Sequence, residues 1–129
     1  MTIINDLKGK IIVSSQAMPD EPFYDEKCMN AMMQSVVNGG AGGLRVAGAR
    51  DTRNAKKFGL PVIGLTKPDK LPENWKSVVY ITPSLKEVRE LIEEKTSIQV
   101  VQVIGRVLVL FKVSANKDAR ELSSRVAEI

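Results

Sequence analysis

The chain has 129 residues and a formal net charge of +4, and 43% of its residues are hydrophobic, 26% charged and 5% aromatic. This composition fits one globular domain and excludes a disordered or fibrous chain, and the absence of histidine excludes Ser-His or Cys-His catalysis and a His-ligated metal. The basic residues are scattered and aromatic residues are few, so we expect an anionic small molecule as ligand and no nucleic acid.

The N-terminal residues 1–10 carry charges and no apolar core of a signal peptide. No stretch of the sequence reaches the roughly 18 apolar residues that a membrane span needs. The single Cys28 cannot form an internal disulfide, which is compatible with a reducing compartment. We therefore expect a cytoplasmic protein without a membrane partner.

Short apolar runs alternate with helical patterns over the first 95 residues. Each run is apolar throughout, which is typical of parallel strands buried on both faces. The predicted strands are residues 9–17, 44–48, 61–66 and 77–82. The predicted helices are residues 25–38, 50–59 and 84–95.

Two of these helices have clear local signals. Asp25 suits the N-cap of the helix at 25–38, and Ser84 with Glu87 forms a capping box for the helix at 84–95. The first helix has an apolar stripe at i, i+3, i+4, i+7 and i+8, formed by Met29, Met32, Met33, Val36 and Val37. We expect this stripe to pack in the core.

The chain changes character after residue 95. Residues 97–113 are rich in β-branched residues, with a turn signal at Gly105-Arg106, so a hairpin and a single kinked strand both fit. Residues 117–129 are predicted to form a last helix. We therefore divide the one domain into a β/α region, residues 1–95, and a divergent tail, residues 96–129.

In parallel β/α folds, active residues gather at the carboxyl ends of the strands. The polar residues at these ends are Ser14, Ser15, Gln16, Arg45, Thr66, Lys67, Tyr80 and Thr82. Gln16, Arg45 and Lys67 would converge on one rim, which suits an anionic ligand such as a phosphorylated sugar.

Each of these three residues also has a purely structural interpretation. Lys67 can simply mark where a strand reaches solvent. Arg45 can form an ion pair with Asp51 or Asp69, and Gln16 can hydrogen-bond loop backbone. The residues alone leave these alternatives open.

Four segments occur in a characteristic order and spacing: "GKIIVSSQA", "GGAGGLRVAG", "LPVIGLTKPD" and "VYITPSLKEVREL". Together they resemble the N-acetylmannosamine-6-phosphate 2-epimerase family over roughly residues 7–93. The resemblance implies a TIM-barrel fold and an isomerase of amino-sugar and sialic-acid catabolism. It also implies inversion at carbon 2 between N-acetylmannosamine 6-phosphate and N-acetylglucosamine 6-phosphate, without a cofactor.

The resemblance also assigns roles to the three rim residues. Lys67 matches the lysine that acts as acid/base at carbon 2, whereas Arg45 and Gln16 match substrate-binding residues. Desolvation at the end of a buried strand and the charge of Arg45 would both lower the pKa of Lys67, so that its amine could serve as a base near neutral pH.

The sequence departs from the family pattern in three respects. Ser15 replaces the usual cysteine, Ala47 stands where an amide is expected, and the tail lacks the family's strand ending in a carboxylate. A TIM barrel needs about 200–250 residues, so we expect about half a barrel. Its open edges predict a homo-oligomer, and the alternative function is an inactive half-barrel remnant or a self-associating module that binds anionic metabolites.

Overall fold

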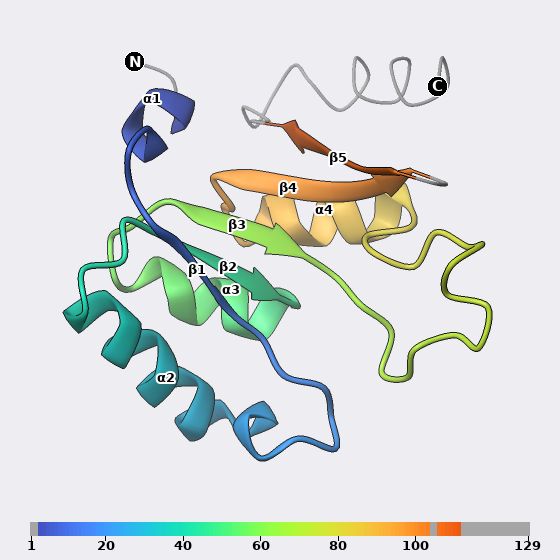
Figure 1. Ribbon diagram of the computed structural model, residues 1–129, viewed down its shortest axis with the longest axis horizontal. Helices are drawn as coiled ribbons and strands as arrows, with labels where there is room; N and C mark the ends of the chain where they lie inside the picture. Colours follow the sequence, from blue (N-terminus) through green and yellow to red (C-terminus); the bar gives the residue numbers. More distant parts are fainter. Residues whose placement is uncertain (1–2, 104–105, 112–129) are drawn as a thin grey trace.

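The computed structural model describes residues 3–103 and 106–111, with side chains for residues 3–98. Strands alternate with helices along most of this length (Figure 1). The elements in order are α1 Ile3–Leu7, β1 Ile12–Ser15, the 3-10 helix η1 Pro22–Tyr24, α2 Glu26–Asn38, β2 Gly43–Ala47, α3 Ala49–Lys56, β3 Val62–Leu65, α4 Leu85–Glu93, β4 Ile98–Val103 and β5 Arg106–Phe111. The predicted helix at 117–129 lies outside the described residues.

The five strands form one sheet in the order β1-β2-β3-β4-β5. The pairs β1–β2, β2–β3 and β3–β4 are parallel. The apolar runs predicted this arrangement for the first three strands, but not for β4. β5 runs antiparallel to β4, so residues 97–113 contain a hairpin and not one kinked strand. β4 lies in the tail that we separated at residue 96, and it extends the parallel sheet without a break.

The two faces of the sheet are covered differently. Helices α2, α3 and α4 lie along one face of the sheet (Figure 1). Successive residues of a strand point alternately to this face and to the opposite one, and each face carries apolar side chains. The core on this helical face consists of Met29, Met33, Leu44, Val46, Ala55 and Val62. On the opposite face, Ile63, Leu65, Ile81 and Ile98 form a second cluster. Ile3 and Leu7 of α1 pack against that cluster.

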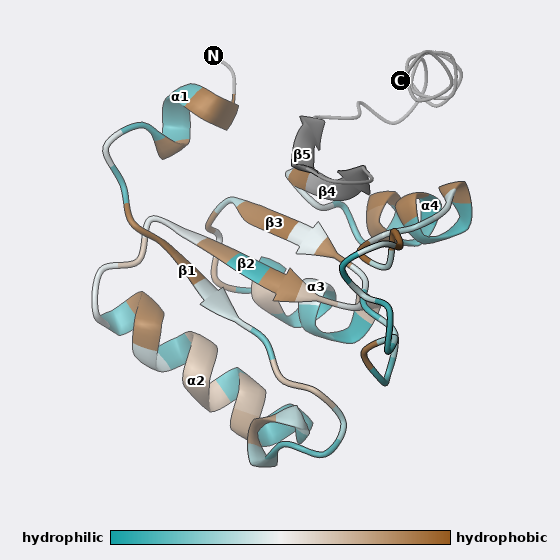
Figure 2. Ribbon diagram, turned by 45° about the vertical axis from the view of Figure 1, so that its right-hand side comes forward, coloured by the Kyte–Doolittle hydropathy of each residue, from teal (hydrophilic) through white to brown (hydrophobic). Residues whose placement is uncertain are grey.

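The helix signals of the sequence are confirmed. The Asp25 carboxylate accepts hydrogen bonds from the backbone N–H groups of Lys27 and Cys28, and the Ser84 hydroxyl accepts one from the N–H of Lys86. Of the apolar stripe on α2, Met29 and Met33 are fully buried, and the other three residues are partly buried against them. Figure 2 shows the apolar and polar residues alternating along this helix.

The strand predicted at 77–82 is wrong. These residues form turns and loop, because β4 already occupies the edge of β3 that they would have joined. Ser97 donates from its backbone N–H to the carbonyl of Val62, and Ile98 pairs with Ile63. Ile81 packs against Ile63 and Leu65 of β3, and Thr82 hydrogen-bonds to Thr66, the residue that follows β3. Helix α1, which the sequence did not predict, is too short to form by itself and packs through Leu7.

Candidate active site

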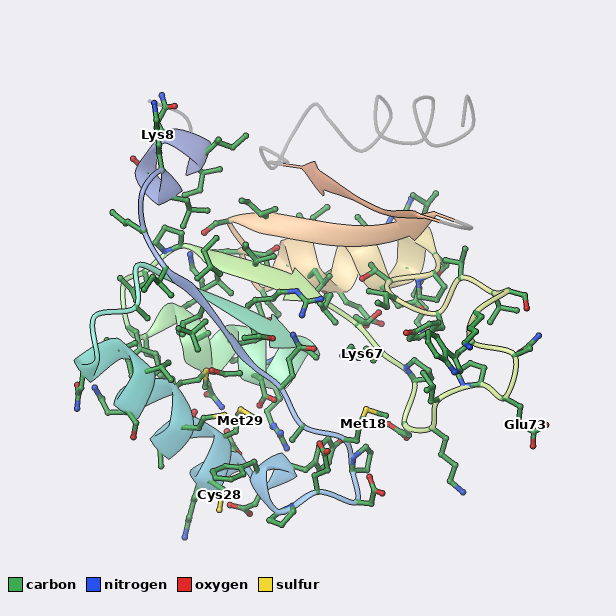
Figure 3. All side chains as sticks on the ribbon, viewed as in Figure 1. Lys8, Met18, Cys28, Met29, Lys67 and Glu73 are labelled. Atoms are coloured by element: carbon green, nitrogen blue, oxygen red, sulfur yellow. The ribbon has the colours of Figure 1, made fainter. Side chains whose placement is uncertain are left out.

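The carboxyl ends of β1, β2 and β3 lie side by side because the three strands are parallel neighbours. Gln16 directly follows β1, Arg45 lies within β2, and Lys67 is the second residue after β3. Figure 3 shows Lys67 beyond the end of the sheet, on the side of the loop that carries Met18. Gln16 and Lys67 therefore lie beyond the carboxyl ends of their strands, as predicted, whereas Arg45 lies in the middle of its strand.

Ser14 joins two of the three predicted residues. It pairs with Arg45 across β1 and β2, so both side chains lie on the face opposite the helices. Gln16 Nε2 donates a hydrogen bond to Ser14 Oγ at 2.7 Å, and Arg45 Nη1 donates to the same oxygen at 3.3 Å. Gln16 Oε1 is buried, and no described residue hydrogen-bonds to it. The amide of Gln16 is thus oriented by a side chain and not by loop backbone.

A cavity of about 490 Å³ opens at this rim. Gln16 and Lys67 both line it. Its remaining wall comes from the loop after β1, the first turn of α3 and the residues after Lys67, namely Ala17, Met18, Pro19, Glu21, Tyr24, Ala47, Gly48, Ala49, Arg50, Asp51, Pro68 and Asp69. Gly48 has a φ of 83°, a conformation that favours glycine, and it lets the chain turn directly from β2 into α3.

Lys67 has the electrostatic environment that the sequence predicted. Its side chain reaches solvent, but the surrounding protein removes water from the amine, and this desolvation is the main cause that lowers the Lys67 pKa. The positive charge of Arg45 lowers the pKa further, while the carboxylate of Glu21 acts in the opposite direction. At a given pH, the amine of Lys67 is therefore neutral more often than that of an ordinary lysine, and the neutral amine can accept a proton.

Arg45 is half-buried and pairs with neither of the two carboxylates considered from the sequence. Burial lowers its pKa, but a guanidinium stays charged at any working pH. Among the described residues, the ion pairs join Arg50 to Asp51, at 2.8 Å, and Arg53 to Glu94. Asp51 is thus engaged by another arginine, and the guanidinium of Arg45 donates to Ser14 Oγ instead.

The sequence did not single out Arg50, which also lines the cavity. Its guanidinium donates to both oxygens of Asp51 and to the carbonyl of Tyr24, and it lies 4.9 Å from the centre of the Tyr24 ring. These contacts tie the first turn of α3 to η1. The only signal in the sequence was a charged pair at the start of a predicted helix, which is common on solvent-exposed surfaces.

A second hollow, of about 520 Å³, lies next to the first. It shares Gly48, Ala49, Lys67 and Pro68 with the first cavity, and its outer wall includes Tyr80, Glu87 and Glu90.

Within the described residues, no group of three His, Cys, Asp or Glu side chains is placed to hold a metal ion. In the same part of the chain, no helix has the length and apolarity to cross a membrane.

Parallel β/α units, with a glutamine after β1, a lysine after β3 and an arginine within β2 between them, define an α/β protein with a polar rim. The family model described as "Putative N-acetylmannosamine-6-phosphate epimerase" matches residues 29–120. The chain belongs to this family. The match continues past residue 93, where the motifs recognised in the sequence end.

The relatives are about twice as long as this chain. A protein of Listeria monocytogenes named "Putative N-acetylmannosamine-6-phosphate 2-epimerase" is 34% identical over 126 residues, which are 97% of this chain and 49% of that protein. A Clostridioides difficile protein of the same name is 35% identical over 128 residues, 98% of this chain and 53% of the relative. The chain thus spans about half the length of the curated relatives it matches.

A solved structure shows the same proportion. The N-acetylmannosamine-6-phosphate 2-epimerase from Clostridium perfringens superposes with a TM-score of 0.71 at 27% identity, over 97% of this chain and 52% of that one. The predicted fold class, parallel β/α units of the TIM-barrel type amounting to about half a barrel, is confirmed.

Proposed function

We propose that this chain carries one part of the active site of an N-acetylmannosamine-6-phosphate 2-epimerase. Such an isomerase interconverts N-acetylmannosamine 6-phosphate and N-acetylglucosamine 6-phosphate in amino-sugar and sialic-acid catabolism. The observation that carries the proposal is the lowered pKa of Lys67 at the edge of a cavity that it shares with Gln16, next to the charge of Arg45. Membership of the epimerase family supports the choice of substrate.

In the proposed reaction, the neutral amine of Lys67 removes the proton from carbon 2 of the open-chain sugar. The electron pair of the broken C–H bond moves toward the neighbouring carbonyl and gives an enolate, and a proton returned to the opposite face of carbon 2 yields the other epimer. Arg45 and Gln16 orient the polar substrate and remain in the same protonation state. The sequence of steps has no net redox change, so we propose that no cofactor takes part.

Inversion needs a second proton-transfer group on the opposite face of carbon 2. We propose that this group and the phosphate anchor are supplied from outside residues 1–95, through association of the chain with a second copy. The exposed residues at β1 support this idea, because Ile11 and Ile12 are 73% and 40% exposed and no described strand pairs with the outer edge of β1. We place the protein in the cytoplasm, where its exposed Cys28 would remain reduced.

Incubation of the purified chain with each sugar phosphate in deuterated water tests the proposal. One base can remove a proton and return a deuteron to the same face, so we expect the signal of the carbon 2 proton to disappear from the NMR spectrum at any protein concentration. Conversion to the other epimer should appear only at concentrations at which the chain associates. Lys67→Met is the matched control and should not exchange. If the wild-type chain and the Lys67→Met variant exchange equally, Lys67 is not the base.

A second candidate, an inactive remnant or a module that only binds anionic metabolites, would use the same cavity and the charge of Arg45. This candidate predicts chemical-shift changes on addition of the sugar phosphate but no exchange at carbon 2. Sedimentation at micromolar protein concentration tests the proposed association, for which we expect a dimer or larger species.

A further inference from the structure

The loop that follows β3 closes on itself at the residue before Lys67. The backbone N–H of Thr82 donates to the carbonyl of Thr66 at 3.0 Å, and the backbone N–H of Thr66 donates to Thr82 Oγ1 at 3.1 Å. Two residues 16 positions apart are thus joined by two hydrogen bonds. Lys67 is the first residue inside the closed loop, so its backbone is fixed by this contact as well as by β3.

Thr82 has an unusual backbone conformation for its residue type. Its φ is 47°, although it is β-branched, and only 1% of its surface is exposed. Such a conformation costs on the order of 1–3 kcal/mol and persists only where the surrounding structure holds it. Here the preceding residue, Ile81, is buried in the cluster with Ile63 and Leu65, and Pro83 stiffens the chain that follows. The two hydrogen bonds to Thr66 are therefore made at a cost in backbone strain.

The strained conformation of Thr82 matters because Lys67 lines two neighbouring hollows. On one side lies the cavity with Gln16, and on the other lies the hollow with Glu87 and Glu90. The charges that act on the Lys67 amine are those of Arg45 and Glu21, and Glu21 lines the first cavity. An amine that moved into the second hollow would approach two carboxylates instead, which would favour its protonated form.

We propose that Thr82 is a positioning residue for Lys67, and that its paired hydrogen bonds with Thr66 hold the lysine amine at the cavity it shares with Gln16. The significance of this position rests on the proposed function, in which the neutral amine is the base. The contact itself is independent of that function, and it can be tested on the free chain without substrate.

Competitive acetylation with acetic anhydride at a series of pH values, read by peptide mass spectrometry, measures the reactivity of each lysine. Lys27 on α2 serves as the internal reference. In Thr82→Val the side chain keeps its shape but the acceptor for the Thr66 N–H is lost, and we expect Lys67 to react at least about threefold more slowly at neutral pH relative to Lys27. Thr82→Ser restores the acceptor and should restore the reactivity.

Two further variants separate positioning from general loss of stability. Val36→Ala weakens the core on the helical face, where it packs in α2, and should lower the unfolding temperature without changing the reactivity of Lys67. Thr82→Gly tolerates the positive φ while lacking the hydroxyl, so it tests the same hydrogen bond even if Thr82→Val does not fold. We expect Lys67 to lose reactivity in Thr82→Gly as well.

An unchanged Lys67 profile in a folded Thr82→Val or Thr82→Gly variant would overturn the proposal. An equal loss of reactivity in Val36→Ala would also overturn it, since the effect would then reflect stability alone. A failure of the epimerase proposal has a different signature, namely wild-type protein that never exchanges the carbon 2 proton although Lys67 reactivity depends on Thr82.

Discussion

Gly64 of β3 packs against Leu91 of α4 and against Thr96, and a single added methyl group tests that packing. A Cβ at Gly64 would lie 2.4 Å from Thr96 Cγ2 and 3.1 Å from Leu91 Cδ2. Leu91 is fully buried, and Thr96 is held by a hydrogen bond from its Oγ1 to the carbonyl of Leu91 at 2.8 Å, so neither neighbour can move freely. Overpacking of this kind costs about 1–3 kcal/mol, and we expect the upper half of that range for Gly64→Ala.

Replacing glycine also restricts the unfolded chain, which offsets about 0.4–1 kcal/mol. The net loss of about 2 kcal/mol corresponds to a fall of roughly 6–10 °C in the unfolding midpoint for a domain of this size. Thermal unfolding followed by circular dichroism, with urea titration as a second measure, gives both quantities.

Gly43 in β2 is the matched control, because its Cβ would meet Leu7 Cδ2 at 2.8 Å. That atom is the flexible end of a side chain in the short helix α1, so Gly43→Ala should cost much less. Thr96→Ser removes the clashing methyl group and keeps the hydroxyl, and in the Gly64→Ala background it should recover more than half of the loss. Wild-type stability in Gly64→Ala, or no recovery with Thr96→Ser, would refute the described packing of α4 against β3.

Three other changes have defined outcomes. Lys67→Met should abolish proton exchange at carbon 2 while leaving the circular dichroism spectrum unchanged, and full exchange by the variant would contradict its role as base. Arg45→Lys should weaken sugar-phosphate binding in calorimetry more than it slows exchange, because a lysine lacks the fixed fork of donors; unchanged affinity with lost exchange would argue against a binding role. Asp25→Ala should lower the unfolding temperature by removing the N-cap of α2. Hydrogen bonds, first from the N–H of Cys28, lower the Asp25 pKa, so this difference should be present above the ordinary pKa of aspartate and vanish as the pH falls through the lowered value. A difference that persists at the lowest pH would show that the cap does not depend on the carboxylate charge.

Local patterns predicted those parts of the fold whose determinants lie close together in the sequence. The N-cap Asp25, the stripe around Met29 and the capping box at Ser84 each act within one or two turns of helix, so the sequence alone identifies α2 and α4. Gln16 and Lys67 could also be predicted to share an edge, because parallel strands of one sheet place their carboxyl ends together, whereas Arg45 lies within β2.

The failures depend on contacts between distant residues. Residues 77–82 have the composition of a strand, but whether they pair with β3 is decided by β4, which starts at Ile98 and takes the same edge. The hydrogen bond from Arg50 to Tyr24 also joins residues 26 positions apart, and no periodic pattern in the sequence predicts it. The strained Thr82 likewise has no signature in its own residue type, since its conformation results from Thr66 and Ile81.

Because β4 and β5 form a hairpin, the two border strands of the sheet, β1 and β5, run in opposite directions. At β1 the border strand points in the same direction as β2 and β3, with its carboxyl end at the rim that holds Lys67. At β5 the chain runs the opposite way, so its amino end faces that rim. A strand that adds in parallel beside β1 would bring its own carboxyl end, and the residue that follows it, to the same rim. A strand that adds in parallel beside β5 would point away. Parallel addition that brings further strand ends to this rim therefore proceeds from the β1 border, whereas addition at β5 has to be antiparallel.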